Sequence, residues 1–139
     1  MTPRSRPSPL ARAIVALNAL TFIGLGIAFL ISPTEMAAIV DLEGTSPLAR
    51  SDLRAIYGGI ELGIGALLLV KLLDGDLAPA LRSLLFIFGA MILSRLFSLF
   101  ADGMPAQPGT LLLGLEVAAF SSAALGLRMI GRRPRRPRP

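Results

Sequence analysis

The chain has 139 residues, 53% of them hydrophobic, and a mean hydropathy of +0.69. A soluble domain of this length usually cannot bury so much apolar surface, so the composition favours one compact membrane domain whose main partner is the lipid bilayer. Cysteine and histidine are absent, which excludes disulfides, thiol nucleophiles, histidine-ligated haem and the usual zinc sites. Because no nucleophile and base can be paired, we expect no enzymatic activity and no cofactor.

The formal net charge of +5 comes mainly from arginines at the two ends of the chain. These arginines flank apolar segments and have no aromatic residues interleaved, so we expect no nucleic-acid binding. Residues 1–12 form a basic N-terminal segment. Residues 131–139 combine arginine with proline, which prevents a helix, so we expect a disordered tail that contacts anionic lipid headgroups.

The first predicted transmembrane helix covers residues 13–31, which carry no charge and are long enough to cross the hydrocarbon core. A cleaved signal peptide is the alternative, but the apolar run is longer than usual and no clear cleavage site follows it. Ser32, Pro33 and Glu35 then match a capping box with proline at the first helical position. They predict a short interfacial helix over residues 33–40.

The second predicted helix begins after Ser46, a favoured N-cap residue, and runs to residue 73, with residues 54–73 inside the membrane. Turn-forming residues separate two further spans, over about residues 79–100 and 109–130. Because the connections are short, we expect an all-α, antiparallel four-helix transmembrane bundle over residues 13–130.

Orientation follows from the distribution of arginine and lysine near the predicted helix ends. These residues concentrate at the end of the bundle that carries both termini, whereas the opposite end is acidic. The positive-inside rule therefore predicts a multi-pass protein of the bacterial cytoplasmic (inner) membrane, with both termini in the cytoplasm.

Four charged residues lie within the apolar helices: Arg54, Glu61, Arg95 and Glu116. Charges in hydrocarbon are costly, so such residues usually face the protein interior and pair with one another. The predicted topology puts Glu61, Arg95 and Glu116 at one depth in the outer half of the bundle, with Arg54 nearer the surface. We therefore predict a neutral cluster of two arginines and two glutamates. The arginines would repel a cation, so we expect no metal between the glutamates.

On the second predicted helix, Arg50, Arg54, Tyr57 and Glu61 follow spacings of four, three and four residues, which align them on one face of an α-helix. Arg50 would stand at the outer approach to the cluster. Tyr57 would either join the polar network or anchor the helix at the membrane interface.

Two functions are compatible with these charges. The favoured one is a non-enzymatic structural or accessory bundle, whose charge cluster fixes the helix register and binds a small anionic or lipidic ligand. The alternative is a small proton-coupled transporter or channel-like protein in which Glu61 or Glu116 changes protonation. An arginine within reach of each carboxylate argues against the alternative.

Glycines cluster beside the charged positions of the second predicted helix: Gly58, Gly59, Gly63 and Gly65. Gly59 and Gly63 have the small-xxx-small spacing that lets two helices approach closely. We expect tight packing within the bundle, with Gly24 and Ala28 as a complementary surface on the first helix. A homodimer through this face is the alternative.

The segment over residues 46–59, SPLARSDLRAIYGG, resembles a bacterial family catalogued as domain of unknown function 4345, and Arg-Ala-x-Tyr-Gly-Gly is its most recognisable string. Further agreement is found at these positions: Gly63, Ser94, Arg95, Asp102, Gly103 and Glu116. The resemblance extends over residues 13–128 and leaves the arginine-proline tail outside. It implies a small bacterial membrane protein with four spans and no established activity.

Overall fold

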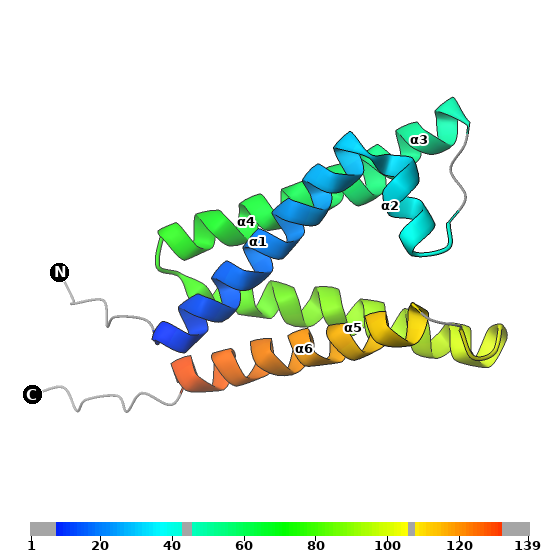
Figure 1. Ribbon diagram of the computed structural model, residues 1–139. Coiled ribbons are helices and arrows are strands. Elements are labelled where there is room, and N and C mark those ends of the chain that lie inside the picture. The colour runs from blue at the N-terminus through cyan, green and yellow to red at the C-terminus, as the bar shows by residue number, and fades with distance from the viewer. Residues whose placement is uncertain (1–7, 43–45, 106–107, 132–139) are drawn as a thin grey trace, which may run out of the picture.

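The computed structural model describes residues 8–42, 46–105 and 108–131, which fold into helices joined by turns (Figure 1). Within these ranges there is no β-strand, and the predicted all-α fold is confirmed. Residues 1–7 of the basic N-terminal segment and residues 132–139 of the predicted tail lie outside the described ranges. In chain order the elements are α1 (Pro9–Ile31), α2 (Pro33–Ile39), α3 (Pro47–Leu53), η1 (Arg54–Ile60), α4 (Glu61–Leu73), α5 (Leu77–Ala101) and α6 (Gly109–Gly131).

Four helical segments are long and apolar enough to cross a membrane: Pro9–Ile31, Pro47–Leu73, Leu77–Ala101 and Gly109–Ile130. The chain therefore has the organisation of a multi-pass membrane protein. The first segment begins before the predicted residue 13, because proline is well tolerated at the first helical position and Pro9 occupies it. The short helix predicted between the first two spans is α2.

The two predicted N-cap serines behave differently. Ser46 caps α3 as expected, since its Oγ accepts a hydrogen bond from the Ala49 N–H at 3.1 Å. Ser32 precedes α2, but its side chain makes no capping hydrogen bond. Its backbone N–H instead donates to the Ala28 carbonyl at 2.8 Å, so the last turn of α1 leads directly into α2. The predicted capping box is therefore wrong, although α2 begins at Pro33 as expected.

Helices α2 and α4 both end with a residue in the left-handed backbone region. After α2, Asp41 has a φ of 59°, and the Leu42 N–H donates to the Ala37 carbonyl at 2.9 Å. After α4, Gly75 has a φ of 72°. This geometry satisfies carbonyls that a helix end leaves without partners. Glycine adopts it freely, whereas aspartate adopts it at a steric cost.

The second span is not one continuous α-helix, because η1 is a π-helix between α3 and α4. A π-helix forms hydrogen bonds from residue i to residue i+5, so each turn takes up more residues than an α-helical turn. The α-helical spacing that aligned Arg50, Arg54, Tyr57 and Glu61 in the sequence does not hold across this segment. Such segments are rare and are often found at functional sites.

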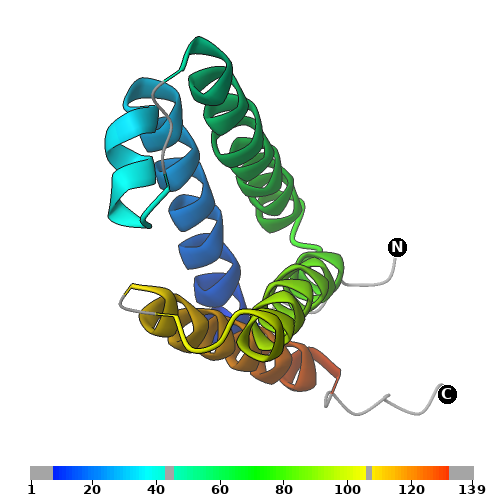
Figure 2. The same ribbon diagram turned by 90° about the vertical axis from the view of Figure 1, so that its right-hand side faces the viewer.

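The helices pack as two antiparallel pairs (Figures 1 and 2). We call α1, η1 and α4 the first arm, and α5 with α6 the second arm. The arms meet at the end of the molecule that carries both described chain ends and the turn from α4 to α5. They diverge toward the other end, where α2, α3 and the connection between α5 and α6 lie. We call this the open end.

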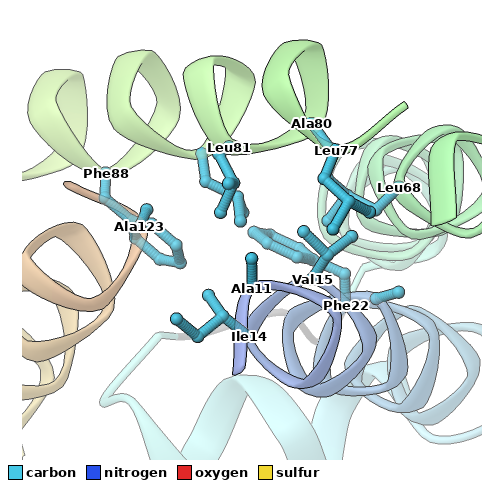
Figure 3. Close-up of a cluster of buried hydrophobic side chains, with 12 residues drawn as sticks. Ala11, Ile14, Val15, Phe22, Leu68, Leu77, Ala80, Leu81, Phe88 and Ala123 are labelled. Atoms are coloured by element: carbon cyan, nitrogen blue, oxygen red, sulfur yellow. The ribbon is translucent and has the colours of Figure 1, made fainter. Parts of the chain in front are cut away.

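The hydrophobic core lies where the two arms meet (Figure 3). Its buried residues are Ala11, Ile14, Val15, Ala19, Phe22, Leu68, Leu77, Ala80, Leu81, Leu84, Phe88 and Ala123. Phe22 of α1 and Phe88 of α5 join the arms directly, with ring centroids 5.9 Å apart. Phe88 is also the last buried residue along α5. In the described part of the chain, buried apolar side chains therefore join the arms on the side of this aromatic pair that carries the chain ends, and not on the side of the open end.

Close packing within the first arm depends on glycines that face each other across α1 and the second span. A Cβ atom on Gly26 would lie 2.7 Å from Leu62 Cγ and 2.9 Å from the Gly58 carbonyl oxygen. A Cβ atom on Gly65 would lie 2.6 Å from Ile23 Cγ1. Neither position has room for a side chain, so glycine allows the two backbones to approach.

Only two of the four glycines singled out in the sequence face α1. Gly58 and Gly65 do so, whereas a Cβ on Gly63 would meet nothing within 4 Å and one on Gly59 would meet only its own helix. The complementary residue on α1 is Gly26, and Gly24 is likewise surrounded by open space. Contact therefore follows the seven-residue spacing of Gly58 and Gly65 instead of the four-residue spacing of the predicted motif.

Candidate functional site

Arg95 and Glu116 project from the inner face of the second arm, beyond the core. Arg95 follows the core residue Phe88 by seven positions on α5, and Glu116 precedes the core residue Ala123 by seven positions on α6. Seven residues make almost two full α-helical turns, so each charged residue shares a face with its core residue and lies about 10 Å from it. On each helix, the charged residue lies on the side of its core residue that is nearer the open end.

Glu61 has the same relation to the core in the first arm. It precedes the core residue Leu68 by seven positions on α4, which is a regular α-helix between these residues. Glu61 therefore faces the bundle interior, again about 10 Å beyond the core toward the open end. The common depth predicted for Glu61, Arg95 and Glu116 stays a prediction, and what the three residues share is a seven-residue distance from a core residue on their own helix.

Arg95 and Glu116 form an ion pair that links α5 to α6. The Arg95 Nε–H donates to both Glu116 carboxylate oxygens, Oε1 and Oε2, each at 2.8 Å. Glu116 is buried, with only 4% of its surface exposed, whereas the Arg95 side chain is 34% exposed. The carboxylate is thus enclosed by the protein and depends on this arginine for its charge compensation.

The remaining donors of Arg95 are not used by the described protein. A guanidinium group has five N–H donors, and in residues 8–42, 46–105 and 108–131 the bonds of Arg95 all come from Nε. The two Nη groups carry the other four N–H donors. Glu116 therefore fixes one edge of a guanidinium whose outer edge stays free to bind an acceptor.

Arg54 does not pair with Glu61, although the predicted charge cluster included both residues. Its Nε–H donates to the Leu30 carbonyl at 3.0 Å, in the last turn of α1. The last carbonyls of a helix lack intrahelical donors, and a cation near them is favoured by the helix dipole. This bond ties the start of η1 to the end of α1 within the first arm.

Of the four charged residues in the predicted cluster, Glu61 is the one without a hydrogen-bond partner among the described residues. Its Oε2 atom is buried and accepts no hydrogen bond from the part of the chain that the structure describes. The single neutral cluster predicted from the sequence is therefore divided into three parts: an ion pair in the second arm, an arginine bonded to a carbonyl in the first arm, and Glu61. The division arises because each arginine bonds within its own arm: Arg54 bonds to α1, and Arg95 bonds to α6.

Tyr57 and Arg50 lie near the open end of the first arm. The Tyr57 ring stacks on Phe29 of α1, with centroids 5.1 Å apart and an interplanar angle of 24°. Phe29 is buried together with Ala37 of α2. Tyr57 thus contributes its ring to the packing of η1 on α1. Arg50 lies on α3 and is partly buried.

Comparison with known proteins identifies the family. A family model described as Domain of unknown function (DUF4345) matches residues 10–127. The chain belongs to the DUF4345 family. Neither the curated proteins nor the solved structures contain a match to it. The matched range contains all the charged residues of the inner faces and ends before the arginine-proline tail.

The charged groups on the inner faces of this DUF4345 protein are carboxylates and guanidinium groups. Nowhere in its described residues do three or more acidic side chains gather as a metal site would require. The inner faces instead present hydrogen-bond donors on Arg95 and an acceptor on Glu61. Chemically, this arrangement can bind polar groups of either charge in apolar surroundings.

Sequence reasoning missed two features that define the site in the DUF4345 chain. The first is the pair of Phe22 and Phe88, beyond which the arms diverge. The second is the Leu30 carbonyl, which takes the bond of Arg54. The first feature left a signal in the sequence. Arg95 follows Phe88 by seven residues and shares its helix face, so the apolar character of that face ends between these two residues. A backbone acceptor leaves no signal in the sequence.

Proposed function

We propose that this DUF4345 protein is a non-enzymatic membrane protein that binds a lipidic ligand through its polar headgroup, at the inner faces of the two arms near the open end. The observation that carries this proposal is Arg95, which is anchored by Nε on Glu116 and keeps both Nη groups unused by the described chain. A planar guanidinium matches phosphate and carboxylate groups with two parallel hydrogen bonds, so the phosphate or carboxylate of a lipid headgroup is its natural acceptor.

The surroundings of Arg95 favour a ligand with acyl chains over a free anion. Apolar side chains flank Arg95 on its own face of α5, because Ile92 and Leu99, three positions before it and four positions after it, are both partly exposed. Arg95 lies about 9 Å from the end of α5 that faces the open end. A bound lipid would place its headgroup at Arg95 and its chains along these side chains.

The proposal is tested by native mass spectrometry of the purified protein, followed by titration of lipids that differ only in their headgroups. The wild-type protein should retain lipid, and the double variant Arg95→Gln with Glu116→Gln should lose it while remaining folded. The double variant replaces the ion pair by two neutral amides that can still bond to each other. Arg54→Gln is the matched control, because this arginine is engaged by Leu30 and should not affect binding. Unchanged lipid retention in the double variant would overturn the proposal.

A second candidate function is favoured by Glu61 alone. A buried carboxylate oxygen without a hydrogen-bond partner among the described residues is typical of a group that exchanges protons. In this alternative, the chain is a small proton-coupled transporter or channel-like protein. Glu116 is less suited to the same role because Arg95 holds its charge. The test is proton flux into proteoliposomes under a pH gradient: Glu61→Gln should abolish it, and equal flux in both proteins would exclude the alternative.

For the cellular setting, we propose the bacterial inner membrane with both termini in the cytoplasm. Support comes from Arg12, Lys71, Arg82 and Arg128, which lie on the segments next to the end where the arms meet. Because the chain contains no cysteine, single cysteines report orientation without background. Ser46→Cys should react with a membrane-impermeant thiol reagent in intact cells, as the open end faces outward. Asp74→Cys should react only after permeabilisation.

A further inference from the structure

The inner faces carry opposite polar character on the two arms. The second arm presents the donors of Arg95, whereas the first arm presents the acceptor of Glu61. Arg95 lies about 10 Å beyond Phe88 along α5. Glu61 is level with about Gly26 of α1, which packs on Leu62 and lies about 6 Å beyond Phe22. Both charged residues therefore lie on the open side of the pair of Phe22 and Phe88, with an offset of about 4 Å along the molecule. A molecule bound between the arms on this side would meet a cation on one arm and a carboxylate on the other.

The balance of charge excludes a simple anion as the best ligand. Arg95 and Glu116 already neutralise one another, and the charge of Arg54 is held at the end of α1. An anion bound to Arg95 would therefore add a second negative charge to the inner faces beside that of Glu61. Like charges in apolar surroundings repel strongly, so the anion would need a compensating cation.

A simple cation meets the opposite difficulty. It would pair with Glu61, but it would leave the Nη donors of Arg95 without an acceptor. A ligand that carries both charges removes both problems, since its anionic group binds Arg95 and its cationic group binds Glu61.

The unsatisfied Oε2 atom of Glu61 further restricts which kind of cationic group is suited to the site. Its buried Oε2 lacks a donor in the described residues, and a buried acceptor is satisfied only by a group with N–H or O–H bonds. A primary ammonium has three such donors. A quaternary ammonium has the same charge but none, so it would leave Oε2 unsatisfied.

Resting on the function proposed above, we infer that the ligand is a zwitterionic lipid whose headgroup combines a primary ammonium with a phosphate. The phosphate bonds to the Nη groups of Arg95, and the ammonium donates to the carboxylate of Glu61. Glu116 acts as a positioning residue, because it holds the guanidinium through Nε and leaves the outer edge for the phosphate.

The test compares lipids that share the same acyl chains and differ in the headgroup. Phosphatidylethanolamine, phosphatidylcholine and phosphatidylglycerol are titrated into the full-length protein in detergent, and apparent Kd is measured by native mass spectrometry. Phosphoethanolamine without acyl chains shows whether the headgroup alone is enough; we expect no measurable binding, because the chains contribute apolar contact. The wild-type protein should prefer phosphatidylethanolamine over each of the other lipids by about tenfold or more, the effect of one well-formed charged contact.

The variant Glu61→Gln tests whether the Glu61 carboxylate is responsible for the headgroup preference. It should remove the preference for phosphatidylethanolamine over phosphatidylglycerol while lipid binding persists through Arg95. Glu61→Asp keeps the charge and should keep the preference, which provides a second reading if the amide variant is unstable. Asp102→Asn is the matched control, since it neutralises an exposed carboxylate just beyond α5 and should leave the preference unchanged.

The outcomes separate the inference from the proposed function. Equal affinity for the three lipids in the wild-type protein, or an unchanged preference in Glu61→Gln, would overturn the inference while the proposed function stands. Failure of every lipid to bind would overturn both. Binding of phosphoethanolamine as tightly as of the whole lipid would overturn the lipid ligand in favour of a soluble zwitterion.

Discussion

Replacing Arg95 by glutamine should destabilise the protein more than replacing Glu116 by glutamine, although both changes remove the same ion pair. Arg95→Gln leaves the Glu116 carboxylate in a site that is 4% exposed, where an uncompensated charge costs about 3–5 kcal/mol. Glu116→Gln leaves an arginine whose side chain is 34% exposed and can turn toward water or headgroups. The second change therefore costs mainly the charged hydrogen bonds, about 1.5–3 kcal/mol.

The double variant distinguishes the free energy lost with the ion pair from the cost of leaving one buried charge without a partner. With both residues changed to glutamine, no buried charge remains, so the double variant should be more stable than Arg95→Gln alone. The free energy of unfolding is measured by adding sodium dodecyl sulfate to protein in mild detergent micelles and following the helical circular dichroism. If Glu116→Gln is the costlier change, or if the double cost equals the sum of the two single costs, the assignment of Glu116 as the enclosed partner is refuted.

Three further predictions concern packing and backbone. Gly26→Val should destabilise the first arm by more than 1 kcal/mol, about the cost of forcing a side chain into filled space, whereas Gly24→Val has open space and should be nearly neutral in the same unfolding assay. Asp41→Gly should raise stability and Asp41→Val should lower it by about 1–2 kcal/mol, because the φ of 59° strains a β-branched residue; a reversed order would contradict this backbone. Phe88→Ala should cost about 3–5 kcal/mol and increase the separation between spin labels on the two arms, while unchanged separation would show that the aromatic pair does not join them.

The sequence was sufficient for features that depend on local chemistry and on helix length. The four spans follow from apolar stretches long enough to cross a bilayer, and the start of α3 follows from serine before proline. The pairing of Arg95 with Glu116 agrees with the general cost of a lone charge in hydrocarbon. Each of these inferences needs only a residue type and its place in a helix.

Features that depend on the packing of one helix against another could not be predicted in the same way. The π-helical turn of η1 changes the direction of every side chain after Arg54, and its residue types do not distinguish it from an α-helix. The contact glycines differ from the expected ones because the crossing of α1 selects Gly58 and Gly65. Arg54 bonds to a backbone carbonyl, and such an acceptor exists at the end of every helix.

The divergence of the arms and the isolation of Glu61 have a common physical origin. In the outer half of the described structure, Arg54 is bonded to Leu30 within the first arm, and Arg95 is bonded to Glu116 within the second arm. Neither polar bond crosses between the arms, so the described residues of the two arms are joined by the apolar core and by the turn from α4 to α5, both at the other end. Glu61 is then the inner charged residue whose buried Oε2 accepts no hydrogen bond from the described residues of either arm.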